Sequence, residues 1–267
     1  MSDDVLRNPL SLFDISGKTA IVVGASGAFG RAVSIALGAL GTNLLLASGS
    51  AEPLAEVAAE AADAGGNVRT LVRRPETVAD AAAIVAEAVA AFGGADLLVV
   101  ASSYNSPAFI HEMDYEDWQQ VQDANVRGPW LMAKAFGTYL IEHERPGKVL
   151  FMSSVRGRHG NNSGYTAYCT SKGAVDSLTR VLATEWGRYG ITVNAIAPTV
   201  FRSNLTAWIF ADDERGAAVR ARNLTRIPLG RLEEPEDMIG AALYLLSPAS
   251  DFCSGQVLYV DGGYTAA

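Results

Sequence analysis

The sequence predicts an α/β protein built on a doubly wound parallel sheet of about seven strands, with helices on both faces. Short apolar runs alternate with longer alanine-rich stretches along the whole chain, which is the order of a strand–helix repeat. Most of the short runs are continuously apolar, as expected of strands covered on both faces. Because 49% of its 267 residues are hydrophobic, the chain can bury a large core, and we expect a single domain over residues 1–267.

Seven segments have the length and composition of buried strands. They are bounded by glycine, proline or polar residues, which mark the turns between elements. The predicted strands are residues 19–23, 43–47, 67–72, 96–101, 148–153, 192–196 and 256–260.

The stretches between the predicted strands have the spacing of helices, and alanine, the best helix former, is frequent in them. The predicted helices are residues 51–64, 78–92, 117–141, 165–189 and 235–246, together with a helical run through Ala36, Leu37 and Leu40.

A glycine-rich turn directly follows the first predicted strand. Gly24, Gly27 and Gly30 separate this strand from the helical run. Such a turn lets backbone N–H groups and a helix N-terminus approach a pyrophosphate without a Cβ in the way. A tight strand–helix connection has a similar composition, but the order of strand, glycine turn and helix favours a dinucleotide site.

Tyr168 and Lys172 lie four residues apart in a predicted helix and therefore share one face. A tyrosine with a pKa near ~10 is a poor acid or base at neutral pH, and a cation one helical turn away favours the phenolate. Ser154, at the end of a predicted strand, could hold a carbonyl or alcohol oxygen against the phenol. The Tyr–Lys spacing alone is common in amphipathic helices, so the prediction depends on Ser154 and the glycine turn as well.

In the order and spacing of these landmarks, the chain resembles the short-chain dehydrogenases/reductases of the classical type from about Leu12 onward. The landmarks are the glycine turn, Asn125, Ser154, Tyr168 with Lys172, residues 194–198 and residues 260–263. The resemblance implies a Rossmann-type fold and hydride transfer between a nicotinamide and an alcohol or ketone. It implies Tyr168 as general acid and base, Lys172 holding the nicotinamide ribose and lowering the tyrosine pKa, Ser154 orienting the substrate oxygen, and Asn125 supporting a water-linked proton relay.

The resemblance also assigns cofactor contacts, although the chain departs from the family pattern at several of them. Val23 and Ala28 replace a threonine and a glycine of the first turn, and residues 100–103 replace Asn-Asn-Ala-Gly. The implied cofactor-binding residues are Gly24, Ser26, Gly27, Phe29, Gly30, Ser48, Arg73, Ala101, Asn125, Tyr168, Lys172, Pro198, Val200 and Ser203.

Ser48 predicts a preference for NADP(H), with NAD(H) tolerated. Dinucleotide sites that prefer NAD usually carry an acidic residue about 20 residues past the glycine turn, and uncharged Ser48 occupies that place. The next position, where the family's NADP enzymes often have an arginine, is Gly49. The positive charge for a 2′-phosphate would therefore come from Arg73 or Arg74.

Residues 198–228 form one long connection, and long connections in compact domains are often functional. Apolar residues around Trp208, followed by the charged run 212–215, predict an amphipathic helix that covers the substrate, with a static packing segment as the alternative. The expected substrate contacts are Ser154, Arg156, Arg158, Tyr165 and Trp208. These arginines, with His159 and Arg202, suit a hydroxyl-rich or anionic substrate, unless they form salt bridges between subunits.

Composition narrows the remaining classes. The net charge of −8 argues against non-specific nucleic-acid binding. No apolar span is long enough for a membrane helix, and residues 1–15 are expected to be a polar N-terminal extension, so the protein is expected to be cytoplasmic. Cys169 and Cys253 lack metal-ligand spacing and the three histidines are scattered, which predicts no metal site.

Two alternatives remain beside a dehydrogenase of a polyol or sugar derivative. One is a 3-oxoacyl-type ketoreductase, and the other is a non-catalytic dinucleotide-binding regulatory protein. The resemblance also implies a homotetramer, for which Trp130, Trp186 and the apolar tail 257–264 are candidate contacts.

Overall fold

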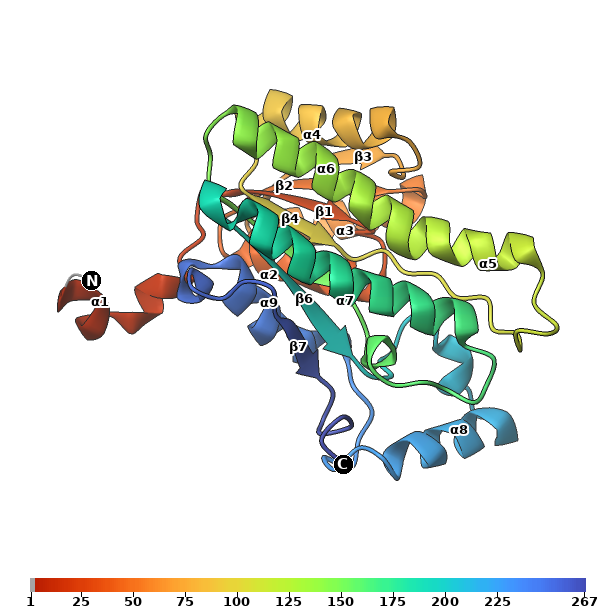
Figure 1. Cartoon of the computed structure of the whole chain (residues 1–267). Coiled ribbons are helices and arrows are strands. Elements are labelled where there is room, and N and C mark those ends of the chain that lie inside the picture. Colours follow the sequence, from red (N-terminus) through yellow and green to blue (C-terminus); the bar gives the residue numbers. More distant parts are fainter. Residues whose placement is uncertain (1–2) are drawn as a thin grey trace.

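The computed structural model describes residues 3–267 and forms one seven-stranded, all-parallel sheet (Figure 1). The strand order is β3-β2-β1-β4-β5-β6-β7, and every neighbouring pair is parallel. The strands are β1 (Thr19–Val23), β2 (Asn43–Ser48), β3 (Asn67–Val72), β4 (Leu97–Val100), β5 (Gly147–Met152), β6 (Ile191–Pro198) and β7 (Val257–Val260). The predicted fold class is confirmed, and the predicted strands match these seven to within a few residues at their ends.

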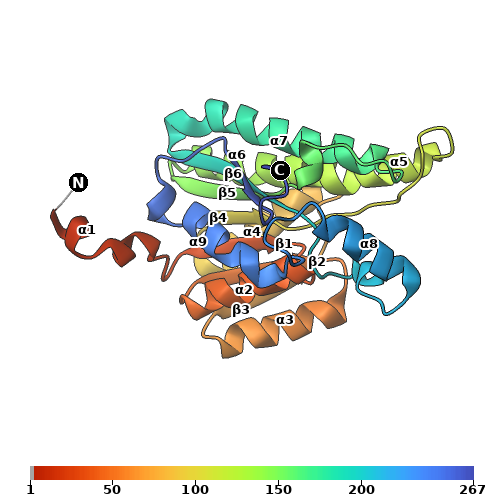
Figure 2. The same ribbon diagram turned by 90° about the horizontal axis from the view of Figure 1, so that it is seen from below.

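Helices cover both faces of the sheet, as Figure 2 shows. On one face lie α2 (Ala28–Ala39), α3 (Ala51–Asp63) and α9 (Ile239–Leu246), and on the other lie α4 (Val78–Phe92), α5 (Tyr115–Gln122), α6 (Gly128–Glu142) and α7 (Thr166–Trp186). Alternate residues of β1 divide between the two layers: Ile21 and Val23 pack with α4, α6 and α7, whereas Ala20 and Val22 pack with α2, α3 and α9. This double burial explains why the strands are continuously apolar.

The chain reverses its direction of winding at β1. From β1 it proceeds outward to β2 and β3, then returns to β4 on the other side and continues to β7. In such sheets, ligands bind in the crevice beyond the carboxyl ends of the strands at the switch point. Gly24, directly after β1, lies at this crevice and packs against the backbone of the loop after β4. A Cβ on Gly24 would lie 2.6 Å from the Ser102 nitrogen, and the φ of Gly24 is +79°. Only glycine suits both constraints.

The long helix predicted over residues 117–141 is interrupted in the structure. A π-helical turn, Asp123–Arg127, separates α5 from α6. Such turns often occur at functional sites. This turn carries Asn125, which is buried at 1% exposure. Hydrophobic periodicity does not distinguish a single π-helical turn from the flanking α-helix, so the prediction missed the break.

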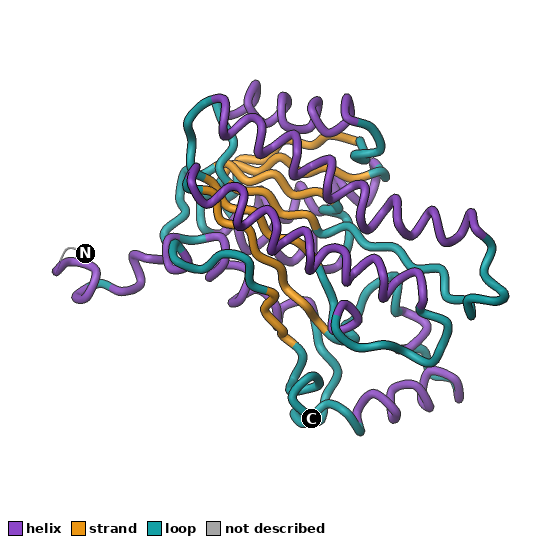
Figure 3. The backbone as a smooth tube through the Cα atoms, viewed as in Figure 1, coloured by secondary structure: helices purple, strands orange, loops and turns teal. Residues whose placement is uncertain are grey.

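The amphipathic helix predicted around Trp208 is wrong in its position. The structure has a short 3₁₀ turn at Ala207–Ile209, and the helix α8 begins only at Glu214 and runs to Leu224. Asp213 sets this start because its carboxylate accepts a hydrogen bond from the Gly216 N–H. Figure 3 shows α8 beside the loops at one end of the sheet.

The N-terminal extension has two parts. Helix α1 (Asp3–Arg7) and a 3₁₀ turn at Pro9–Phe13 project from the body, as Figures 1 and 2 show, whereas Ile15 is already buried in the core. Residues 1–2 of the predicted extension lie outside the described residues. Over residues 3–267, no helix combines the length and apolar character needed to cross a membrane.

Candidate active site

A cavity of about 1160 Å³ opens at the carboxyl ends of the strands. It brings together most of the residues that the sequence singled out, from seven separate parts of the chain. Those that line it are Gly24, Ser26, Gly27, Phe29, Ser48, Arg73, Ala101, Ser154, Arg156, Tyr165, Tyr168, Pro198, Val200, Ser203 and Trp208. Its size and position suit a dinucleotide together with a small substrate.

Four predicted residues do not line the cavity. Gly30 packs against the first turn, where a Cβ would lie 2.2 Å from the Gly24 carbonyl oxygen. Asn125 and Lys172 lie buried behind the cavity wall. Arg158 is exposed, and its guanidinium lies over the Tyr259 ring at 5.9 Å from the centroid. The structure therefore separates Arg158 from the substrate contacts that the sequence predicted.

Tyr168 stands in the cavity wall on the first turns of α7. Its hydroxyl is hydrogen-bonded to the hydroxyls of Ser154, which follows β5, and Ser103, which follows β4. Burial raises the pKa of the Tyr168 phenol, and these two hydrogen bonds lower it. Hydrogen bonds to the phenolate stabilise the charged form, so the two serines partly offset the burial.

Lys172 is completely buried one helical turn further along α7. Its Nζ donates a hydrogen bond to the Met152 carbonyl oxygen at 2.9 Å and lies 5.4 Å from the centroid of the Tyr168 ring. Burial lowers the pKa of Lys172 to about 7, and the charge of Asp176 opposes this. The spacing of the two residues predicted their shared face but not this burial.

Asn125 ties the loop after β4 to α7. Its Oδ1 accepts a hydrogen bond from the Tyr104 N–H at 2.7 Å. Its Nδ2 donates to the Tyr104 carbonyl at 2.8 Å and to the Ser171 hydroxyl at 2.9 Å. Because Tyr104 directly follows Ser103, these bonds hold the Ser103 hydroxyl in place against Tyr168. Asn125 thus positions the site from behind.

The far end of the cavity, beside β2, carries the residues expected at the adenosine. Ser48 is 8% exposed and its hydroxyl is hydrogen-bonded to the Ser26 hydroxyl. Arg74 lies directly over Gly49, where a Cβ would be 2.1 Å from the Arg74 Nε. Arg73 also lines the cavity, but it forms an ion pair with Asp80. Of the two arginines that the sequence left open, Arg74 is therefore the one beside Ser48 with no ion pair among the described residues.

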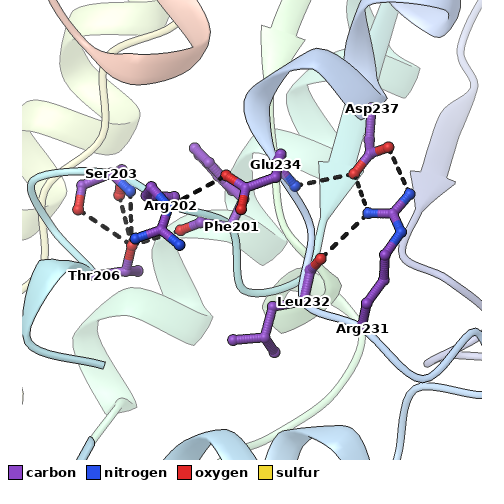
Figure 4. Close-up of polar contacts among 8 residues, drawn as sticks. All are labelled: Phe201, Arg202, Ser203, Thr206, Arg231, Leu232, Glu234 and Asp237. Carbon is purple, nitrogen blue, oxygen red and sulfur yellow. Dashed lines mark hydrogen bonds and ion pairs between the residues drawn. The ribbon is translucent and has the colours of Figure 1, made fainter. Parts of the chain in front are cut away.

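Local polar contacts fix the conformation of the segment after β6 (Figure 4). The Thr206 hydroxyl accepts a hydrogen bond from the Ser203 N–H at 3.0 Å and donates one to the Phe201 carbonyl. Arg202, which the sequence placed among the substrate donors, pairs instead with Glu234 at 3.4 Å. Ser203, in contrast, lines the cavity as expected.

The cavity-lining residues that sequence reasoning missed include Ser103, Arg215 and Arg222. Ser103 ends the segment 100–103, which departs from the family pattern and to which the sequence assigned no catalytic role. Arg215 and Arg222 are seven residues apart and therefore share one face of α8, but the sequence did not fix where α8 begins. Among residues 3–267, no three His, Cys, Asp or Glu side chains are grouped as metal ligands would be.

Comparison with known proteins places the chain among oxidoreductases. A family model described as "Enoyl-(Acyl carrier protein) reductase" matches residues 24–265. An uncharacterized oxidoreductase of Mycobacterium tuberculosis is 49% identical over 257 residues, covering 96% of this chain and 94% of that protein. Gluconate 5-dehydrogenase of Gluconobacter oxydans is 33% identical over 262 residues, covering 96% and 98%.

A solved structure shares the fold along nearly its whole length. It is a gluconate 5-dehydrogenase from Burkholderia cenocepacia in complex with NADP and tartrate. The TM-score is 0.90 at 29% identity, covering 97% of this chain and 100% of that one.

Proposed function

The chain belongs to the short-chain dehydrogenase/reductase family and is an oxidoreductase, and we propose that it interconverts a secondary alcohol and a ketone on a polar, sugar-derived substrate with NADP(H). One observation carries this proposal. Tyr168 lines the same cavity as the glycine turn after β1. Its hydroxyl is hydrogen-bonded to Ser154, and Lys172 lies one helical turn away.

The residues around the cavity fit a nicotinamide dinucleotide. The glycine turn after β1 and the N-terminus of α2 line the cavity, where they would receive the pyrophosphate. Ser48 and Arg74 would hold a 2′-phosphate, and NAD(H) would be bound more weakly because it lacks that group. When bound, the nicotinamide supplies or accepts the hydride.

Tyr168 would carry the proton. In reduction its phenol donates a proton to the carbonyl oxygen, and in oxidation its phenolate removes the proton of the alcohol. The Ser154 hydroxyl would orient the same substrate oxygen. A protonated Lys172 would favour the phenolate, and the anionic cofactor would favour protonation of this buried lysine.

The substrate class is supported by the relatives. Several of them are named as dehydrogenases of sugar acids or polyols, including the gluconate 5-dehydrogenase of Gluconobacter oxydans and a D-threitol dehydrogenase of Mycolicibacterium smegmatis. A 3-oxoacyl-type ketoreductase is the alternative within the family. A dinucleotide-binding protein without turnover would not need the complete set of Asn125, Ser154, Tyr168 and Lys172.

The test is a turnover assay on a panel of polyols, sugar acids and 3-oxoacyl ketones, run with NADP(H) and with NAD(H). We expect the highest kcat/KM for a hydroxyl-rich substrate with NADP(H). A clear preference for 3-oxoacyl ketones would support the alternative, and no turnover on any substrate would contradict the proposal.

We also propose a homotetramer, as in the family resemblance. Trp186 and Tyr264, two of the predicted contacts, are buried within the single chain at 9% and 1% exposure. Trp130 on α6 and Val181 on α7 are 46% and 47% exposed and remain available for contact between subunits. A mass in solution of one chain, 28.1 kDa, would contradict the tetramer.

A further inference from the structure

We propose that Arg156, Arg215 and Arg222 form a binding site for an oxyanion at one end of the cavity, so that the substrate carries a carboxylate or phosphate group. This inference rests on the proposed function, because it describes the part of the substrate that does not react. It goes beyond that function by naming the group that is recognised and the residues that recognise it.

The three arginines come together from two separate elements. Arg156 follows the end of β5, two residues after Ser154, whereas Arg215 and Arg222 lie on one face of α8. All three line the cavity. Burial raises the pKa of Tyr165, and the positive charges of all three arginines lower it. The three guanidinium groups therefore act electrostatically on one phenol that also lines the cavity.

None of the three arginines has an acidic partner in the described part of the chain. Other arginines of this region do: Arg202 pairs with Glu234, and Arg231 pairs with Asp237. On α8 itself, Arg220 is used structurally, because its guanidinium donates to the carbonyls of Ile209 and Ala211. Arg156, Arg215 and Arg222 therefore each keep an unneutralised positive charge at the cavity.

Neutral contacts hold these arginines without cancelling their charge. Arg156 Nη1 donates to the Gly160 carbonyl at 3.0 Å. Arg222 Nη2 donates to the Ser163 hydroxyl at 3.3 Å. The Arg215 guanidinium lies 4.6 Å from the centroid of the Trp208 ring. Positioning of this kind orders the guanidinium groups before an anion binds, which reduces the entropy lost on binding.

The position of the site relative to Tyr168 limits the size of the substrate. The rings of Tyr165 and Tyr168 meet edge to face with centroids 6.0 Å apart. An anion beside Tyr165 is therefore only a few bonds from an alcohol or ketone carbon at Tyr168. This arrangement suits a short hydroxy acid or sugar phosphate, whose oxyanion a guanidinium grips with two parallel hydrogen bonds.

The test compares three probes on the wild-type protein and on two variants. The probes are gluconate, its neutral counterpart glucitol, and glucitol 6-phosphate. The test variant is the double substitution Arg215→Gln and Arg222→Gln. The matched control is Arg226→Gln, because Arg226 follows α8 and stacks on Tyr264 without lining the cavity. Thermal unfolding checks that all three proteins are folded, and calorimetry measures binding independently of turnover.

We expect the double variant to bind gluconate or glucitol 6-phosphate at least about tenfold more weakly, with little change for glucitol. The wild-type protein should bind whichever anion it prefers more tightly than glucitol, and added salt should weaken only that binding. The Arg226→Gln variant should behave as the wild type. The stronger of the two anionic probes identifies carboxylate or phosphate as the recognised group.

Equal affinity for glucitol and both anions, or an equal loss for all three probes in the double variant, would overturn the anion site. Failure of the proposed function looks different. If no probe is turned over but an anion still binds and is weakened by the double substitution, the anion site stands and the assigned reaction fails.

Discussion

The two walls of the cavity are built differently. The wall that carries Tyr168 is supported from behind by completely buried Lys172 and by Asn125, which makes three hydrogen bonds. The opposite wall, residues 199–224, is a short 3₁₀ turn and α8, and it presents Trp208 at 38% exposure and two exposed arginines. We expect the first wall to fix the geometry of the reaction. The second is free to vary, and we expect it to determine which substrate reacts.

The largest effect should come from the buried lysine. We expect Lys172→Met, which keeps most of the volume and removes the charge, to lower kcat/KM at least about 100-fold and to weaken cofactor binding. The expected cause is the loss of both the charge near the phenol and the contact to the ribose that is proposed for Lys172. Turnover and a fluorescence titration with NADPH would measure the two effects. A variant with wild-type turnover would show that the supporting residues behind the first wall do not matter.

A smaller change is expected at the adenosine end of the cavity. Ser48→Asp places a carboxylate beside the position proposed for the 2′-phosphate, and the repulsion should shift the ratio of kcat/KM for NADP and NAD by about tenfold or more toward NAD. Ser48→Asn is the neutral control. A strong preference of the wild-type protein for NAD would contradict the NADP(H) preference inferred from the missing acidic residue and from Arg74.

Ser103→Ala tests whether the loop after β4 belongs to the catalytic wall. The Ser103 hydrogen bond lowers the pKa of Tyr168, so its removal should raise that pKa further. In alcohol oxidation the phenolate is the active form, and the rising limb of kcat/KM against pH should therefore move to higher pH. An altered rate with an unshifted pH profile would mean that Ser103 serves packing only.

Glu233 anchors the start of the covering wall and offers a test on stability alone. It is 6% exposed, and its Oε2 accepts a hydrogen bond from the Thr199 N–H at 2.9 Å, where the covering segment begins. Burial raises the pKa of Glu233 to about 8 from 4.5, so between these values the folded chain keeps a proton that the unfolded chain has lost. The contribution of Glu233 to stability therefore falls as the pH rises through this window.

Glu233→Gln removes this titration. Relative to the wild type, the variant should become more stable as the pH rises from about 5 to 8, by at most about 1.4 kcal/mol per pH unit. Urea unfolding at several pH values would measure the difference. A difference in stability that does not change with pH would show that the buried carboxyl does not titrate in this window.

How far the sequence predicted the molecule differs between the same two walls. The strands were predictable because double burial leaves continuous apolar runs, and the spacing of Tyr168 and Lys172 placed them on one face of a helix. The burial of Lys172 was not predictable, because spacing says nothing about what packs over a side chain. The covering wall was predicted less well. The helix begins only at Glu214 because Asp213 caps it there. Whether an arginine forms an ion pair depends on contacts between residues distant in the sequence, so the sequence did not show that Arg202 is paired and Arg222 is not.

The central claim is that Tyr168 carries the proton, and the most direct measurement compares Tyr168→Phe with Tyr165→Phe. Both remove one hydroxyl from the same cavity wall, three residues apart. We predict that Tyr168→Phe lowers kcat at least about 100-fold with little change in the Kd for NADPH, whereas Tyr165→Phe keeps most of its turnover. A Tyr168→Phe protein that keeps a large share of the wild-type kcat would contradict the account.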